Sequence, residues 1–346
     1  ALRFSFLAHL FSGKDFKFSE QRLEGYRNFM NKVWNAARFA ISNLSDFTPP
    51  KDGVKALPDK NSMSVFDQWI ITKLAEVEKN VDEALATEKF SEAATSLYQF
   101  IWNQFCDWYI EFTKPIINGS KKKKKQATQL VMAQVLNRVV RLMHPFAPFI
   151  TEEIYQKLPI RGEALIIDSY PTVKLDKAFL ALGSEEVALE LDLVREVITA
   201  LRNIRGENRI KPGVKINARL APKEAKEQKI LGGNKNSIMT MARLETCEIG
   251  EAGDLAKCAV QPVLVGGMSV DVIVPLEGLV DIGEEVNRIR KSIEKLQREV
   301  AGLTQRLSDK NFVANAPEEI VTAGRAQLDD SRKQIATLEG ALARLI

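Results

Sequence analysis

The stretch GYRNFMNKVWNAARF, residues 25–39, decides the fold of the first part of the chain. If residues 20–44 are helical, small polar and basic side chains recur along one side at steps of three and four. These residues are Asn28, Asn31, Asn35, Arg38 and Ser42. The opposite side carries Phe29, Val33, Ala36, Ala40 and Leu44. The pattern predicts an amphipathic helix whose apolar face packs on a core and whose outer face presents amide and guanidinium groups.

Two interpretations of that outer face stay open at this point. Asn and Arg side chains can hydrogen-bond to exposed base edges, and a neighbouring aromatic ring can stack on an unpaired base, as in the recognition of single-stranded RNA. The alternative is an ordinary surface helix whose Asn side chains hydrogen-bond to nearby backbone. Composition alone favours the ordinary helix.

The helical period continues from Phe18 to about Pro159, with breaks at residues 46–62 and 118–125. Ser64 is placed to cap a long amphipathic helix, and the aromatic-rich segment 91–115 should lie at the centre of a bundle. The run Lys121–Lys125 is interpreted as a solvated loop, with a loose phosphate contact as the alternative. His144, at a helix break before Pro145, is interpreted as structural.

The pattern of apolar residues changes beyond Pro171. A helix over residues 184–210 is followed by four β-branched segments, which predict a small α+β domain. From Ile282 onward apolar residues repeat at steps of four and three, and after a short break the same heptad resumes at Val321. Two such helices predict an antiparallel coiled-coil hairpin with arms of about 40 Å.

Composition limits the classes of protein to which the chain can belong. Its 346 residues, 45% of them hydrophobic, are enough for two or three domains, and a net charge of +4 excludes a polybasic protein. The three cysteines are far apart, which suggests neither a disulfide framework nor a metal site and makes a reducing cytoplasm the default. Only two histidines and no glycine-rich phosphate loop are present, which argues against a free-standing enzyme with catalytic residues of its own.

Three motifs resemble the anticodon-binding helical bundle of class I aminoacyl-tRNA synthetases of the valyl, isoleucyl and leucyl group. They are ALRFSFLAHL with GKDFKFSEQRLEGYRNFMNKVWNAARF at the start, WNQFCDWYIEFTKP at 102–115 and LMHPFAPFITEEIYQ at 142–156. The ending, with LSDKNFVANAPEEIV at 307–321 and no Cys-rich zinc module, is similar to the valyl family rather than the isoleucyl one. The resemblance spans the chain and is weakest from about 171 to 280.

The resemblance implies a mainly α fold in three parts. We expect an anticodon-binding bundle over residues 1–170, a small α+β junction domain over 171–280 and a coiled-coil arm that binds the outer corner of tRNA over 281–346. The family's His-x-Gly-His and Lys-Met-Ser-Lys-Ser signatures and its editing domain are absent, so we read the chain as a C-terminal fragment with no catalytic, cofactor or metal site. ATP and Mg would be used by the rest of the parent enzyme. Expected partners are tRNA(Val) and the catalytic and editing domains of the same parent chain, in a cytoplasmic monomer without membrane contact.

The resemblance also implies the site residues. For the anticodon these are Arg22, Asn35, Arg38, Phe39, Ile110 and Glu111. Phe39 would stack on a base, Asn35 and Arg38 would hydrogen-bond to base edges or phosphate, and Glu111 would accept from a base amino group. Ile110 and Glu111 rest on the resemblance more than on chemistry, and Phe39 could equally belong to the core.

On the arm, basic residues crowd the first helix outside its apolar seam: Arg288, Arg290, Lys291, Lys295 and Arg298. As a group they are candidates for phosphate contacts. The alternative is a solvated face with ion pairs to Glu294 and Glu299. Two other functions stay open. Heptads alone would suit a coiled-coil interaction protein, and an isoleucyl or leucyl fragment is disfavoured only by the ending.

Overall fold

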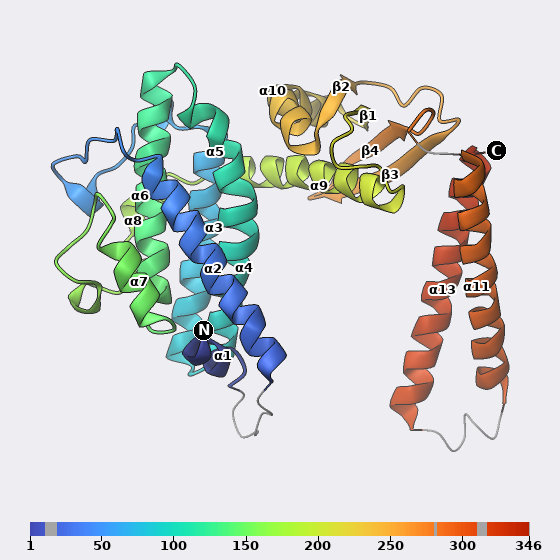
Figure 1. Ribbon diagram of the computed structural model, residues 1–346, viewed down its shortest axis with the longest axis horizontal. Helices are drawn as coiled ribbons and strands as arrows, with labels where there is room; N and C mark the ends of the chain where they lie inside the picture. Colours follow the sequence, from blue (N-terminus) through green and yellow to red (C-terminus); the bar gives the residue numbers. More distant parts are fainter. Residues whose placement is uncertain (11–18, 280–281, 310–316, 346) are drawn as a thin grey trace. The chain divides into compact units, whose positions relative to one another are not determined.

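The computed structural model describes residues 1–10, 19–279, 282–309 and 317–345 (Figure 1). It divides into two compact units, Ala1–Leu191 and Asp192–Ile346. The fold is mainly helical with one four-stranded sheet, which confirms the predicted fold class. The predicted domain limits near 170 and 280 stay a prediction. In the described part of the chain, no helix is both long and apolar enough to cross a membrane.

The first unit is a helix bundle. Its main helices are α1 (Leu2–Ala8), α2 (Glu20–Ser42), α3 (Val65–Ala86), α4 (Phe90–Gln99), the π-helix η3 (Phe100–Tyr109), α5 (Ile110–Ile117), α6 (Lys122–Met143), α7 (Pro148–Tyr155) and α8 (Lys177–Leu180). Short 3-10 turns occur at η1 (Gly53–Lys55), η2 (Lys60–Ser62) and η4 (Leu165–Ile167). The division between the units falls inside α9 (Glu185–Glu207).

Helix α2 has the two faces that the sequence predicts. Ser19 caps it by accepting a hydrogen bond from the Arg22 backbone N–H. The predicted polar side is exposed or half-buried throughout: Asn28, Asn31, Asn35, Arg38 and Ser42. Phe29, Val33 and Ala40 are buried as expected, and Leu44 just beyond the helix is also in the core. Ala36 is only half-buried, and its neighbour Ala37 is buried in its place, a shift of one position.

The aromatic-rich segment lies at the centre of the bundle, as predicted, but with an unpredicted geometry. Ten residues of it form a π-helix between α4 and α5. Phe100, Phe105 and Tyr109 are each at most 1% exposed. The wider turn of a π-helix changes which residues share a face, and such stretches occur frequently at functional sites.

The lysine run is not a loop, so that prediction was wrong. Helix α6 begins at Lys122, and nearly all its positions from Ala127 to Met143 are buried. Packing of this long face extends the helix back through lysines that would oppose its dipole in isolation. Lys125 also forms an ion pair with Asp46 at 2.6 Å.

The second unit contains the predicted strands. They are β1 (Ile216–Pro222), β2 (Leu244–Ile249), β3 (Cys258–Val265) and β4 (Met268–Pro275), in the order β2-β1-β4-β3. β1 and β2 are parallel and are joined through α10 (Ala225–Ala242), a helix for which the sequence analysis made no prediction. β3 and β4 form an antiparallel hairpin whose turn places Gly266 and Gly267 at positive φ, as a two-residue hairpin turn requires.

The heptad segments form α11 (Ile282–Ser308) and α13 (Glu318–Leu345), which pack side by side as a hairpin (Figure 1). Ile289, Ile293 and Val321 are buried in their seam. At 27 and 28 residues, each helix has the predicted length of about 40 Å. Most of the turn predicted at 308–319 lies outside the described residues.

A buried carboxylate, Asp67, joins three elements of the first unit. It is fully buried and accepts hydrogen bonds from the Ser64 backbone N–H (2.8 Å) and hydroxyl (2.7 Å), closing a capping box at the start of α3. Tyr109 of η3 donates to it at 2.8 Å and Thr128 of α6 at 2.7 Å. Burial raises the pKa of Asp67, while the hydrogen bonds from Ser64, Thr128 and Tyr109 oppose that rise.

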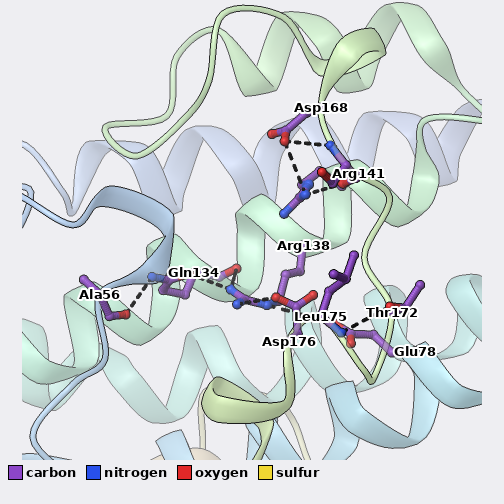
Figure 2. Close-up of polar contacts among 10 residues, drawn as sticks. Ala56, Glu78, Gln134, Arg138, Arg141, Asp168, Thr172, Leu175 and Asp176 are labelled. Atoms are coloured by element: carbon purple, nitrogen blue, oxygen red, sulfur yellow. Dashed lines mark hydrogen bonds and ion pairs between the residues drawn. The ribbon is translucent and has the colours of Figure 1, made fainter.

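A second buried network surrounds Arg138 of α6 (Figure 2). Its guanidinium donates to the Gln134 side chain at 2.5 Å and to Asp176 at 2.7 Å, which fixes the segment before α8 onto the bundle. Glu78 of α3 is fully buried, its nearest contact with Arg138 is 4.0 Å, and neither of its oxygens accepts a hydrogen bond from the described residues. Burial, with Asp176 nearby, raises the pKa of Glu78 to about 8 despite Arg138 and Arg141.

Removing one donor from the Asp67 network should destabilise the bundle. Tyr109→Phe leaves the buried carboxyl one hydrogen bond short, so we expect the free energy of unfolding to fall by about 1–3 kcal/mol. Chemical denaturation monitored by circular dichroism measures the change. Tyr170→Phe is the control, since its hydroxyl donates a longer bond of 3.2 Å to a backbone carbonyl and its loss should have the smaller effect. Equal losses for both variants would contradict a special role for Asp67.

Glu78 should make stability depend on pH. Its folded-state pKa of about 8 lies above the ordinary value of 4.5, so the folded state holds the proton more tightly. The unfolding free energy should therefore fall as pH rises from about 4.5 to 8, by at most about 1.4 kcal/mol per pH unit from this group. Glu78→Gln should remove that decline, whereas the exposed Glu83→Gln should keep it. Parallel pH profiles for wild type and Glu78→Gln would contradict the assignment.

Candidate nucleic-acid interface

Asn35 and Arg38 lie on the exposed side of α2, one helical turn apart. Within the described part of the chain, neither side chain hydrogen-bonds to another residue. Their polar groups are therefore available to an external partner. Exposed amide and guanidinium groups of this kind can hydrogen-bond to base edges or phosphate.

Phe39 and Glu111 come together through a residue that the sequence analysis did not select. Lys114 of α5 places its Nζ 5.3 Å from the centroid of the half-buried Phe39 ring and 2.6 Å from Glu111 Oε1. A lysine three residues after a glutamate on a helix is a recognisable ion-pair signal, but its contact with α2 depends on tertiary packing. The cluster Phe39–Lys114–Glu111 thus joins an aromatic ring, a cation and a carboxylate on adjoining helices.

Phe39 is half-buried, so part of its ring packs on the bundle and part is accessible. Glu111 would have to share or exchange Lys114 in order to accept from a base. Ile110 is 5% exposed, so its side chain offers little surface to a ligand. The assignments of these residues to RNA contacts stay predictions.

Arg22 lies apart from the other predicted residues. It is exposed in the first turn of α2, thirteen residues before Asn35, which is about 20 Å along the helix. Its surroundings are different as well, because it lines a cavity with Tyr26 and Tyr98. The structure therefore does not bring Arg22 into the cluster with Arg38 and Phe39.

The basic residues of α11 are arranged in a stripe. Arg288, Lys291, Lys295 and Arg298 follow one another at steps of three and four and share one side of the helix, whereas Arg290 lies on another. Lys291, Lys295 and Arg298 are exposed and Arg288 is half-buried. Arg298 has a loose ion pair with Glu294 at 3.9 Å, while Glu299 accepts a hydrogen bond from Gln327 of α13 at 2.7 Å. The described residues thus leave most of the positive charge of Lys291, Lys295 and Arg298 unneutralised, so it can attract an anion.

His144 and the three cysteines are the other side chains with distinctive chemistry, and their surroundings indicate structural roles. His144 Nδ1 lies 2.9 Å from the Thr151 hydroxyl, and burial lowers its pKa. Cys106, Cys247 and Cys258 are buried thiols. Among the residues that the structure describes, no three His, Cys, Asp or Glu side chains are grouped so as to hold a metal ion.

Two family models match the chain. Residues 67–220 match the anticodon-binding domain of tRNA ligases, and residues 281–346 match the tRNA binding arm of valyl tRNA synthetase. The first covers most of the bundle and α9, and the second covers the α11–α13 hairpin. Both matches agree with the resemblance inferred from the motifs.

Curated relatives extend the match to the whole chain. The valine–tRNA ligase of Bdellovibrio bacteriovorus is 67% identical over 344 residues, which is 99% of this chain and 38% of that protein. Those of Syntrophotalea carbinolica and Geobacter sulfurreducens are 37% and 39% identical over 100% and 95% of this chain, and 37% and 36% of their own lengths. The chain thus spans less than two fifths of the length of these relatives. It belongs to the valine–tRNA ligase family and contains that family's anticodon-binding domain and tRNA binding arm.

Proposed function

We propose that this chain binds tRNA(Val) at two places, the anticodon and the outer corner, and thereby positions the tRNA for attachment of valine. The exposed side of α2, with the adjoining Phe39–Lys114–Glu111 cluster, is the anticodon surface. The basic stripe of α11 contacts the phosphates of the corner. The observation that carries the proposal is that the chain matches two tRNA-binding family models, one over residues 67–220, which include Lys114 and Glu111 but not α2, and one over the α11–α13 hairpin.

The chemistry of each surface supports its role. Amide and guanidinium groups offer directional donors and acceptors to base edges, and a partly exposed ring offers a stacking platform. A stripe of lysine and arginine attracts phosphates whatever the base sequence of the RNA, as other contacts to the nucleic-acid backbone do. Binding at two places would orient the acceptor end of the tRNA. The chain would thus contribute to catalysis by positioning the tRNA and not by forming a bond.

Valine activation would be carried out by parts of the relatives that this chain does not span, and those parts would use ATP with Mg. The catalytic and editing domains of a parent enzyme would then be partners in the same chain. The alternative of a coiled-coil interaction module is weakened because α11 and α13 fill each other's seam within one chain. A monomer is expected for the same reason.

Arg38→Ala should weaken binding of tRNA with the valine anticodon by about 1–3 kcal/mol, the range for loss of a specific base contact. Fluorescence anisotropy with tRNA(Val) and an anticodon-swapped copy measures both affinity and preference. Arg27→Ala is the matched control, because Arg27 is an exposed arginine of α2 already paired with Glu24 at 2.9 Å. An equal loss for every anticodon would reassign Arg38 to a phosphate contact.

Neutralising Lys291, Lys295 and Arg298 together should lower affinity for all tRNAs and flatten the dependence of log Kd on log salt, by about one unit of slope for each phosphate that the protein no longer neutralises. Titrations at several salt concentrations measure the slope. The control changes three lysines of α10 to glutamine, namely Lys226, Lys229 and Lys235. A slope as steep as that of the wild type would remove the stripe from the interface.

A further inference from the structure

A cavity of about 470 Å³ lies at the N-terminal end of α2, away from Asn35, Arg38 and the Phe39–Lys114–Glu111 cluster, which together are called the Arg38 cluster below. Residues of α1, α2, α4 and η3 line it, together with His9 just after α1. The volume is within the range of about 300–1,000 Å³ that is typical of sites for small ligands. The Arg38 cluster does not account for this cavity.

Aromatic rings form a continuous series that begins at the cavity, where His9, Tyr26 and Tyr98 line it, and continues beyond it to Trp102. His9 and Tyr26 meet edge to face at 5.7 Å between ring centroids, and Tyr26 and Tyr98 do so at 6.3 Å. Tyr98 then stacks on Trp102 at 5.6 Å, and Lys32 Nζ lies 3.8 Å from the centre of the Trp102 ring. The tyrosines are half-buried, so these rings are fixed by packing and still expose part of their surface to the cavity.

The polar groups of the cavity complement a nucleotide. Arg22 is a cation at its rim, and none of the described lining residues is Asp or Glu. Gln99 and Asn103 bring amide groups, and within the described part of the chain their side chains make no hydrogen bond to another residue. Each amide has both donors and an acceptor, which suits the edge of a base.

The glycine at position 25 is a further reason, independent of the lining chemistry, to regard the cavity as a ligand site. It sits inside α2, where glycine is about 1 kcal/mol less favourable than alanine, and a Cβ built on it would have no neighbour within 4 Å. Packing within the described chain therefore gives no reason for a glycine here. The residue does keep the cavity wall open, as close approach of a ligand to a helix requires.

We propose that this cavity receives an unpaired base of the bound RNA, which stacks on the Tyr26–Tyr98 pair. Arg22 contacts the phosphate of that nucleotide, and Gln99 and Asn103 contact the base edge. The proposal rests on the tRNA-binding function proposed above. Arg22 lies about 20 Å from Asn35 along α2, so the base in the cavity belongs to a different nucleotide from the one that Arg38 contacts.

RNA fits the cavity better than a protein segment does. Sequence-tolerant recognition of unpaired bases combines aromatic stacking platforms with nearby cations, and both are present here. A cation at the rim, with no carboxylate among the described lining residues, favours a negatively charged ligand, and phosphate supplies that charge beside every base. An apolar peptide side chain would offer no hydrogen-bonding group to Gln99 and Asn103, whereas a base edge would.

The test fills the cavity without removing any contact of the folded chain. Gly25→Leu places a side chain in the open space, and Gly232→Leu makes the same change at a helical glycine of α10 that also has no neighbour within 4 Å. Full-length tRNA(Val) transcripts carry 2-aminopurine at one unpaired position at a time, and the fluorescence of that base falls when it stacks on an aromatic ring. Thermal melting confirms that both variants are folded.

We expect one 2-aminopurine position to be quenched by wild-type protein and by Gly232→Leu, but not by Gly25→Leu. Gly25→Leu should also bind tRNA about tenfold more weakly, as for loss of one stacked base. The double variant Gln99→Ala with Asn103→Ala should also bind tRNA more weakly, although it leaves the aromatic rings in place.

The outcomes separate this proposal from the one on which it rests. If Gly25→Leu binds and quenches like wild type while Arg38→Ala loses its anticodon preference, the cavity is not a base site and the proposed tRNA-binding function stands. Equal losses in Gly25→Leu and Gly232→Leu would also overturn the cavity site. If wild-type protein binds no tRNA, both proposals fail.

Discussion

The bundle depends on the burial of one carboxylate. Asp67 starts α3 by closing a capping box with Ser64, and it also receives a hydroxyl from η3 and another from α6. A carboxyl this deep in the interior is tolerated only because donors surround it, so the three helices must hold their mutual positions to keep it satisfied. Tyr109, which supplies one of those donors, directly precedes Ile110 and Glu111. The constraint therefore holds the start of α5 against α3.

That constraint leaves α2 with two distinct exposed regions. Near its C-terminal end, Phe39 contacts Lys114 of α5, which is paired with Glu111. Near its N-terminal end, Arg22 and Gly25 border the aromatic cavity that α1, α4 and η3 complete. A straight helix of this length can thus present two groups of RNA-binding chemistry at a fixed separation, whereas loops would have to be ordered on binding.

Elements with a strong period were predictable, because side-chain spacing alone specifies them. The heptads of 282–345 predicted the hairpin, and the β-branched segments after residue 215 predicted the four strands. Predictions failed where packing overrides local preference. The lysines at 122–125 continue a helix because the residues after them are buried, and the π-helix of η3 leaves no mark in a 3.6-residue period. Lys114 was missed for a related reason, since its partner Phe39 is distant in sequence.

The sequence by itself determined the family, the polar and apolar faces of α2 and the pairing of the terminal helices, because motif order and periodicity are local properties. Only the tertiary structure decided that Phe39, Lys114 and Glu111 meet and that Gly25 opens onto a cavity. These relations join residues that are distant in the chain, as in the cavity that His9 shares with Asn103. Long-range packing sets them, and no spacing rule along one helix contains that information.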